Sequence, residues 1–140
     1  MKKYYAVIDT NVLVSSMLKN DSIPGKVVDL LLSGKIIPLL NEEIIEEYED
    51  VLSRNKFGFG EDQINDVIDN LKKKAIFLSR EHTDEPFPDE DDVVFFEICL
   101  SGRSTMDAYL VNGNIRHYPI RSYVVTPRQM LEIVEKESDE

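Results

Sequence analysis

The sequence predicts an α/β protein, built as a three-layer α/β/α sandwich with a mostly parallel central sheet. The main observation is that short, apolar, β-prone runs alternate with segments of helical periodicity along the whole chain. A second observation is that no internal repeat or linker divides these elements, and 140 residues is a usual length for one domain. We therefore expect a single domain over residues 1–140, with a frayed tail at 136–140.

The first half of the chain predicts two strand and helix units and a third strand. Residues 4–8, YYAVI, and 36–40, IIPLL, are short apolar runs, and the segment KVVDLLLSG between them has helical spacing that ends at Gly34. Asn41 is a good N-cap for a helix through EEIIEEYEDVLSR. The turn-rich segment NKFGFG then precedes a helix over EDQINDVIDNLKKK, and AIFLS follows as a strand.

The second half predicts a loop, a buried helix, two strands and a last helix. The segment EHTDEPFPDEDD is polar and lacks periodicity, so it should be a loop that brings acids to the start of the apolar helix VVFFEICLSG. DAYLV (107–111) and SYVVT (122–126) are β-prone. Pro127 suits the first position of the helix PRQMLEIVEKE.

Composition excludes several classes of protein. The 16 Lys and Arg against 27 Asp and Glu give a net charge of −11, which argues against coating nucleic acid by bulk electrostatics. No apolar run approaches the roughly 20 residues that cross a bilayer, so we expect a cytoplasmic protein without a membrane partner. The lone Cys99 lies in the apolar run VVFFEICL and is expected to be a small buried hydrophobe.

Asp9 and Glu47 are the first two candidate site residues. Asp9 follows the strand 4–8, and ligands of parallel sheets bind beyond the carboxyl ends of the strands, although a helix cap or Asx turn explains Asp9 equally well. Glu47 lies three residues after Ile44 and four before Val51, so it shares the apolar face of its helix. Its acidic neighbours fit a solvated face: Glu42, Glu43, Glu46, Glu49 and Asp50.

A run of acids opens the apolar helix that begins near Val93. Residues 89–92 read Asp-Glu-Asp-Asp, which is more negative charge than the start of a helix requires. Because such acids repel one another, a bound cation explains the run, and a solvated acidic loop is the alternative. Asp92 is the last acid before the apolar run and is best placed to point into a pocket.

Polar residues also flank the predicted strand 107–111. Asp107 precedes its apolar part, and Asn112 and Asn114 follow it around Gly113, which permits a tight turn. A structural turn is the stronger interpretation for Asn112, whereas Asn114 fits a turn or a site equally.

In a parallel sheet, Asp9, Glu47, Asp92 and Asn114 can converge from four distant segments. Clustered oxygen ligands without a nearby thiolate or imidazole suit Mg²⁺ or Mn²⁺. Without the metal the carboxylates would repel one another, so we expect a raised pKa for at least one of them and metal binding that depends on pH.

Several ordered motifs make the chain resemble the PIN-domain family, and within it the toxin components of toxin–antitoxin pairs. They are VIDTNVLVSSML, EEIIEEYEDVLSRNKF, PDEDDVVFFEICL, DAYLVNGNIRHYP and VVTP, which together cover nearly the whole chain. The resemblance implies a Mg²⁺- or Mn²⁺-dependent endoribonuclease with Asp9, Glu47 and Asp92 as metal ligands and Asn114 as a further catalytic residue. It also implies an RNA substrate, an antitoxin partner and a homodimer.

The chain departs from the family pattern after the fourth predicted strand. The family often has Thr and then Asp or Asn there, whereas this chain has Asn112 and Asn114. Because Asn114 has no negative charge, it would hold a second metal more weakly, and Asp107 or Asp91 are candidates to compensate. Asn11 and Asn112 complete the secondary candidates. The candidate phosphate contacts are Arg116, His117, Arg54, Lys56 and Arg103.

Two other classes of function stay open on the sequence. One is a catalytically weak PIN-like binding module held by a protein partner, which the neutral Asn114 favours. The other is a receiver-like or phosphatase-like domain, which the absence of a second acid soon after Asp9 disfavours. Dinucleotide binding is excluded because no G-x-G-x-x-G follows the first strand, and no nucleophile elbow supports a hydrolase that uses Ser15, Ser16 or Cys99.

Overall fold

The computed structural model describes residues 2–138 and contains one sheet in which all paired strands run parallel. The strand order is β3-β2-β1-β4-β5. The strands are β1 (Tyr4–Ile8), β2 (Ile36–Leu40), β3 (Ile76–Phe77), β4 (Ala108–Val111) and β5 (Val124–Val125). The predicted α/β fold is confirmed, and the sheet that was expected to be mostly parallel is parallel throughout the described residues.

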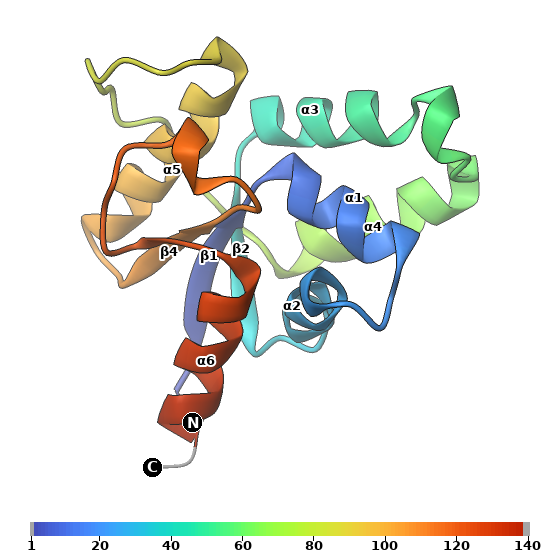
Figure 1. Ribbon diagram of the computed structural model, residues 1–140, viewed down its shortest axis with the longest axis horizontal. Helices are drawn as coiled ribbons and strands as arrows, with labels where there is room; N and C mark the ends of the chain where they lie inside the picture. Colours follow the sequence, from blue (N-terminus) through green and yellow to red (C-terminus); the bar gives the residue numbers. More distant parts are fainter. Residues whose placement is uncertain (1, 139–140) are drawn as a thin grey trace.

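Helices cover both faces of this sheet and form the outer layers of the sandwich (Figure 1). α5 packs against β1, β2 and β4 on one face, whereas α2, α4 and α6 lie on the other, and α1 and α3 extend from the carboxyl edge. The helices are α1 (Thr10–Leu18), α2 (Ile23–Leu32), α3 (Glu42–Leu52), α4 (Glu61–Lys74), α5 (Val93–Arg103) and α6 (Pro127–Ser138). Three short 3₁₀ turns accompany them in the described chain: η1 (Asn55–Phe57), η2 (Glu90–Asp92) and η3 (Ile115–His117).

The predicted helix ends are confirmed at three positions. The Asn41 side chain accepts a hydrogen bond from the Ile44 N–H at 2.9 Å and so caps α3. Gly34 follows α2 with a φ of 88°, a left-handed conformation that favours glycine. Pro127 is the first residue of α6.

Other predicted boundaries were wrong. The segment VLVSSML, to which the sequence assigned no element, forms most of α1, and α2 starts earlier than predicted because Ser22 caps it. The strands predicted over AIFLS and 122–126 reduce to two-residue pairings in β3 and β5. Of the tail predicted to fray, 136–138 belong to α6, and 139–140 lie outside the described residues.

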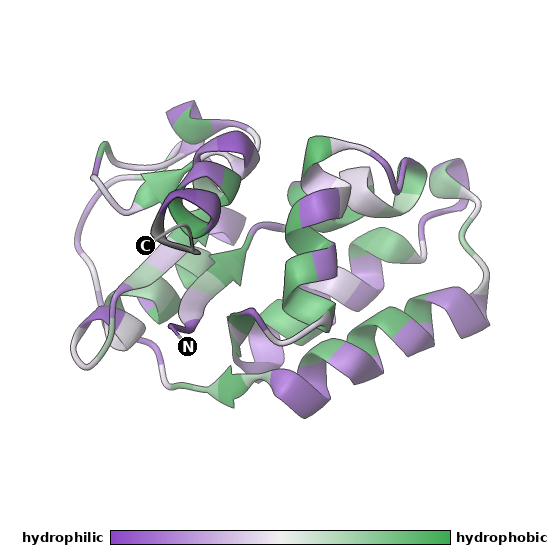
Figure 2. Cartoon of the chain, turned by 90° about the horizontal axis from the view of Figure 1, so that it is seen from below, coloured by the Kyte–Doolittle hydropathy of each residue, from purple (hydrophilic) through white to green (hydrophobic). Residues whose placement is uncertain are grey.

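The core lies on both sides of the sheet, between the strands and the apolar faces of the helices. α4 illustrates the pattern, because hydrophobic and hydrophilic residues alternate along it (Figure 2), with Ile64, Ile68 and Leu71 buried. Cys99 is fully buried as predicted, and burial raises the pKa of its thiol to about 12. No helix in the described part of the chain is long and apolar enough to cross a membrane.

The strand order places a switch point between β1 and β4. The chain moves outward from β1 to β2 and β3, and then crosses the sheet through α5 to pair β4 with the other side of β1. Residues that follow β1 and β4 therefore meet at the carboxyl edge, where open α/β sheets bind their ligands.

Candidate active site

Asp9 is a buried carboxylate held at the carboxyl edge of β1. It is only 6% exposed, and it also occupies the N-cap of α1, where its Oδ1 accepts a hydrogen bond from the Asn11 N–H at 3.1 Å. Its Oδ2 accepts a hydrogen bond of 2.5 Å from the Tyr118 hydroxyl. The capping interpretation and the site interpretation therefore both describe the same side chain.

Asp92 reaches the same region from the start of α5. The Asp89 side chain accepts a hydrogen bond from the Asp91 N–H and forms the turn η2, which leaves Asp92 directly before the helix. The Asp92 side chain is 14% exposed, and its Oδ2 is shielded from solvent without a hydrogen-bond partner among the described residues. A buried carboxylate oxygen without a partner is costly and indicates a missing cation or donor.

Asp9 and Asp92 form an electrostatically coupled pair. Burial raises the pKa of Asp92 to about 6, and the negative charges of Asp9 and Asp89 contribute to this rise. Burial also raises the pKa of Asp9, although the hydrogen bonds from Tyr118 and Asn11 act in the opposite direction. The repulsion expected from the sequence is thus present between these carboxyls.

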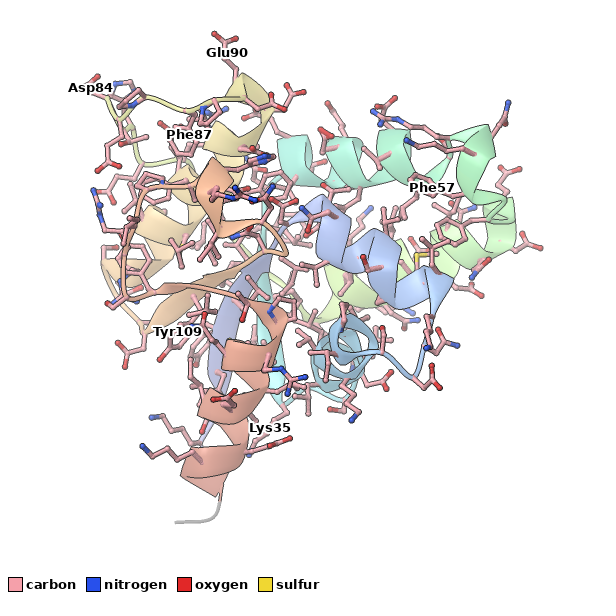
Figure 3. All side chains as sticks on the ribbon, viewed as in Figure 1. Lys35, Phe57, Asp84, Phe87, Glu90 and Tyr109 are labelled. Carbon is pink, nitrogen blue, oxygen red and sulfur yellow. The ribbon has the colours of Figure 1, made fainter. Side chains whose placement is uncertain are left out.

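Glu47 lies beside this pair on α3, at the boundary between core and solvent. Burial raises the pKa of Glu47, and the charges of Asp91, Asp50 and Asp9 raise it further, against the effect of Arg54. Glu47 also lines an acidic hollow of about 440 Å³ between α3 and η2. Glu90, from the same hollow, projects away from the molecule (Figure 3).

The turn after β4 is held by asparagine side chains. The fully buried Asn112 accepts a hydrogen bond from the Asn114 N–H at 2.7 Å, which is the structural turn expected for it. The Asn11 side chain accepts a hydrogen bond from the Gly113 N–H at 3.2 Å and so joins the ends of β1 and β4. Gly113 does not use a left-handed conformation, so the Asn112 side chain makes the turn.

Asn114 faces a histidine and is not turned toward a carboxylate. Its Nδ2 lies 3.1 Å from His117 Nε2, and its Oδ1 accepts a hydrogen bond from the Arg116 N–H. His117 Nδ1 in turn lies 3.5 Å from Asp92 Oδ2. Asn114 therefore reaches the acid pair through His117.

Sequence reasoning missed the role of Tyr118. Its hydroxyl is the hydrogen-bond donor to Asp9, and its ring packs edge-on against Phe87 of the loop before η2. Burial and the charge of Asp9 raise the pKa of Tyr118, so its hydroxyl stays neutral and able to donate. Nothing in the segment IRHYP marks this tyrosine, because its partner lies 109 residues away in the sequence.

The structure does not bring Asp107 and Arg103 together with the other candidates. β4 runs parallel to β1, with Ala108 level with Tyr5 and Val111 level with Ile8, so Asp107 lies at the opposite edge of the sheet from Asp9. Arg103 is also at that edge, where it donates a hydrogen bond to the Ala108 carbonyl and stacks on Tyr123.

The other candidate basic residues differ in how they are engaged. Arg54 pairs with Asp50 at 3.4 Å, and the Lys56 ammonium lies over the ring of Phe57. The Arg116 side chain forms no hydrogen bond or ion pair within the described part of the chain. Arg116 and His117 are therefore the basic candidates beside Asp92.

The candidate ligands do not form a closed cage. Among residues 2–138, no group of three His, Cys, Asp or Glu side chains converges closely enough to hold a metal ion. The charge of Asp9 raises the pKa of both Asp92 and Glu47, so the three acids lie within electrostatic reach of one another. The arrangement is a pair of coupled carboxylates with a third acid nearby.

Comparison with known families identifies the family of the chain. The family model described as "PIN domain" matches residues 5–116, which include Asp9, Glu47, Asp92 and Asn114. The chain belongs to the PIN domain family. PIN domains are generally nucleases and generally use divalent metal ions.

A relative that aligns with nearly the whole chain carries no stated function. The uncharacterized protein MJ1680 from Methanocaldococcus jannaschii is 27% identical over 145 aligned residues, which cover 96% of this chain and 94% of that protein. Membership of the PIN domain family thus agrees with the fold and indicates a nuclease in general, and it does not specify the substrate.

Proposed function

We propose that this PIN domain is a Mg²⁺- or Mn²⁺-dependent endoribonuclease whose acid pair is Asp9 and Asp92. The observation that supports it most is the buried pair itself. Burial raises the pKa of both carboxyls at the switch point of the sheet, the charge of Asp9 raises that of Asp92 further, and Asp92 Oδ2 is shielded from water without a hydrogen-bond donor among the described residues. Such a pair is stabilised by a cation, and RNA is the substrate class that the sequence motifs imply.

The donor set fits a hard divalent cation. Mg²⁺ usually keeps several waters and binds through one or two carboxylates together with substrate phosphate, so a closed protein cage is not required. Asp9, Asp92 and the neighbouring Glu47 would hold the ion. When bound, such an ion lowers the pKa of a coordinated water and neutralises charge on the phosphate.

The residues of the chain then have separate tasks. Tyr118 and Asn11 hold Asp9 in one orientation through hydrogen bonds to its two oxygens. His117 Nδ1 lies 3.5 Å from Asp92 Oδ2, and the Asn114 amide, 3.1 Å from Nε2, orients the imidazole ring. Arg116, exposed beside them, supplies positive charge for the phosphodiester in an otherwise acidic protein.

The first experiment tests metal dependence and RNA preference together. Purified protein is incubated with a mixed structured RNA pool, and separately with single-stranded DNA, in Mn²⁺, in Mg²⁺ and in EDTA, beside Asp9→Asn. We expect RNA cleavage that needs metal and is lost in Asp9→Asn, which also excludes a contaminating nuclease. Equal background cleavage by both proteins under every condition would refute the ribonuclease proposal for these substrates.

The toxin role and its partners are a finer part of the proposal. In a toxin–antitoxin pair, an antitoxin would cover the acid pair and block cleavage. A homodimer is the expected assembly, and the cytoplasm is the expected compartment. Induced expression of the wild type should arrest bacterial growth, whereas Asp9→Asn should not. Growth that is equally normal with both proteins, at equal soluble levels, would remove the toxin proposal and leave the nuclease proposal standing.

The second candidate function is a catalytically weak binding module held by a protein partner. It is favoured by Asn114, whose amide faces His117, and by the absence of a three-ligand group in residues 2–138. Calorimetric titration with Mn²⁺ separates the candidates. Binding that Glu47→Gln weakens and Glu46→Gln leaves unchanged supports the enzyme, whereas no binding by the wild type supports the module.

A further inference from the structure

A second hollow adjoins the acid pair between β4 and β5. It has a volume of about 450 Å³, within the range of pockets that bind small ligands. We call it the β4–β5 hollow, and it is lined by Ile115, Arg116, Tyr118, Pro119, Ile120, Arg121 and Val124. The segment that forms most of it follows η3 and leads to β5, beside α5 (Figure 1).

The β4–β5 hollow and the acid pair share a wall. Tyr118 lines the hollow, while its hydroxyl donates the hydrogen bond to Asp9 Oδ2. η3, which supplies Ile115 and Arg116 to the hollow, also holds His117 next to Asp92. A polymeric substrate bound at the two carboxylates can therefore place its neighbouring monomer in the hollow.

The hollow exposes apolar surface that the fold itself does not need. Ile120 is 95% exposed and Ile115 is 47% exposed, although both are large hydrophobic residues. Pro119 lies between Tyr118 and Ile120 and fixes the local backbone. A flat apolar group of the ligand would cover this surface, as flipped or unstacked bases pack between apolar side chains in other proteins.

Local charge favours an anionic ligand over a neutral one. The chain carries a net charge of −11, yet the hollow contains two arginines. Arg121 is neutralised by its ion pair with Glu85, whereas the Arg116 guanidinium has no partner in the described part of the chain. An unpaired guanidinium presents donors in a fork that matches two phosphate oxygens.

We propose that the β4–β5 hollow binds one unpaired nucleotide of the RNA next to the cleaved bond, with its base against Ile115 and Ile120 and its phosphate on Arg116. This inference rests on the proposed ribonuclease function and adds a specificity subsite to it. Because a base must leave its helix to enter, the subsite selects single-stranded RNA, loops or bulges. The shape of the hollow then decides which bases are accepted.

Binding measurements test the subsite separately from cleavage. In the Asp9→Asn background, which prevents cleavage, the affinity for a short fluorescein-labelled single-stranded RNA is measured by anisotropy in Mg²⁺. We expect Arg116→Gln to weaken binding about tenfold, as loss of a charge-assisted hydrogen bond does, and Ile120→Asp to weaken it similarly. Lys73→Gln on α4 and Leu18→Asp, which replaces another exposed aliphatic residue, are matched controls expected to stay within about twofold.

A direct probe identifies the occupant. Adenosine and uridine monophosphates are titrated into ¹⁵N-labelled wild-type protein in EDTA, with inorganic phosphate as a comparison. The subsite predicts that the nucleotides shift the amide signals of 115–124 more than phosphate does, and that Ile120→Asp reduces these shifts. Equal shifts from phosphate alone would overturn the base-binding part of the proposal.

The outcomes separate this inference from the proposed function. If the wild type cleaves RNA but Arg116→Gln and Ile120→Asp bind it as well as the controls, the function stands and the subsite is wrong. If no RNA is cleaved but nucleotides shift 115–124, the subsite stands and the ribonuclease proposal fails. If Ile120→Asp instead converts a dimer to a monomer in sedimentation, with RNA affinity unchanged, the surface is an interface between copies and the subsite is overturned.

Discussion

Asp92 and Glu97 lie five residues apart at the start and middle of α5, and both carboxylates are withdrawn from water. Glu97 is 4% exposed and is fully compensated, because Arg80 Nε lies 2.6 Å from its Oε1 and the Thr83 N–H donates to its Oε2 at 2.7 Å. The charge of Asp9 raises the pKa of Asp92, and Asp92 Oδ2 has no hydrogen-bond donor among the described residues, with His117 Nδ1 3.5 Å away. Of two shielded carboxylates on one helix, Glu97 in the middle thus has its hydrogen-bond donors, whereas Asp92 at the start lacks one among the described residues.

This difference in hydrogen-bond partners distinguishes a structural acid, Glu97, from a candidate functional acid, Asp92. Arg80 also pairs with Glu43 of α3, so the cation beside Glu97 ties the loop after β3 to two helices. The cost of burying Glu97 is offset within the chain. The cost of burying Asp92 next to Asp9 is offset only in part by the described residues, through His117 Nδ1 at 3.5 Å, and a cation from outside would offset it more fully. Four tests sharpen or break this contrast.

The largest effect is expected on catalysis. Asp92→Asn removes a charge from the pair and should lower metal-dependent RNA cleavage by about a thousandfold, since several kcal/mol of charge stabilisation depend on the site. Asp91→Asn is the matched control, because Asp91 is the exposed neighbour on the same turn. Single-turnover cleavage rates at saturating metal give the comparison. An equal loss in the two variants would mean that burial does not distinguish the functional acid.

The sequence predicts the fold well because its signals are local. Strand 4–8, the Asn41 cap and the Pro127 start are each decided by a few neighbouring residues, and they are confirmed. α1 was not predicted because VLVSSML contains four β-branched or serine positions among apolar residues and shows no polar face. Five of the nine residues of α1 are buried. Its helix depends on the Asp9 cap and on packing, which are not readable from periodicity.

The site is predicted only in part, for a related reason. Asp9, Glu47 and Asp92 follow from strand ends and helical spacing, and their roles as ligands remain predictions. Asp107 lies away from the other candidates because the direction of β4 relative to β1 decides which end of the strand meets the site. Tyr118 could not be found, since its hydrogen bond to Asp9 is created by tertiary packing alone.

The next largest effect is expected on stability at Glu97. Glu97→Gln leaves Arg80 with a weaker partner and turns an amide N–H₂ toward one of the two donors, so we expect a loss of about 2 kcal/mol in the free energy of unfolding. Urea denaturation in EDTA measures it, with Glu81→Gln, an exposed acid of the same loop, as control. A variant as stable as the control would show that the ion pair contributes little and would remove the contrast with Asp92.

Asp92→Asn is expected to change stability in the opposite direction. The pKa of Asp92 is about 6 in the folded protein and about 3.9 in an unfolded chain, so the folded state holds more protons between these values. The free energy of unfolding of the metal-free wild type should therefore fall as the pH rises from about 4 to 7. Asp92→Asn removes this contribution and should stabilise the metal-free protein by about 1–2 kcal/mol at pH 7.

Thermal denaturation in EDTA at several pH values checks this sign. The wild type should lose more stability than Asp92→Asn between pH 4 and 7, and the two should converge at the acid end. Added Mg²⁺ should then stabilise the wild type and leave the variant nearly unchanged. A variant that is less stable than the wild type at pH 7 in EDTA would contradict the idea of an uncompensated pair.

The smallest effect is expected from Tyr118→Phe, and it tests how the chain holds Asp9. The variant keeps the ring against Phe87 but removes the donor to Asp9 Oδ2, which should cost about 1 kcal/mol of stability. Because that hydrogen bond lowers the pKa of Asp9, its loss should raise this pKa and shift the acid limb of the pH–rate profile to higher pH.

Tyr48→Phe supplies the control, since the Tyr48 hydroxyl donates a hydrogen bond of 2.5 Å to the Ile8 carbonyl and to no carboxylate. The two variants should lose similar stability, yet the acid limb should move in Tyr118→Phe alone. A shift in both would mean that loosening the end of β1 is enough to disturb Asp9. No shift in either would mean that burial sets the proton affinity of Asp9, in which case Tyr118 acts through the shape of the β4–β5 hollow and not through its hydroxyl.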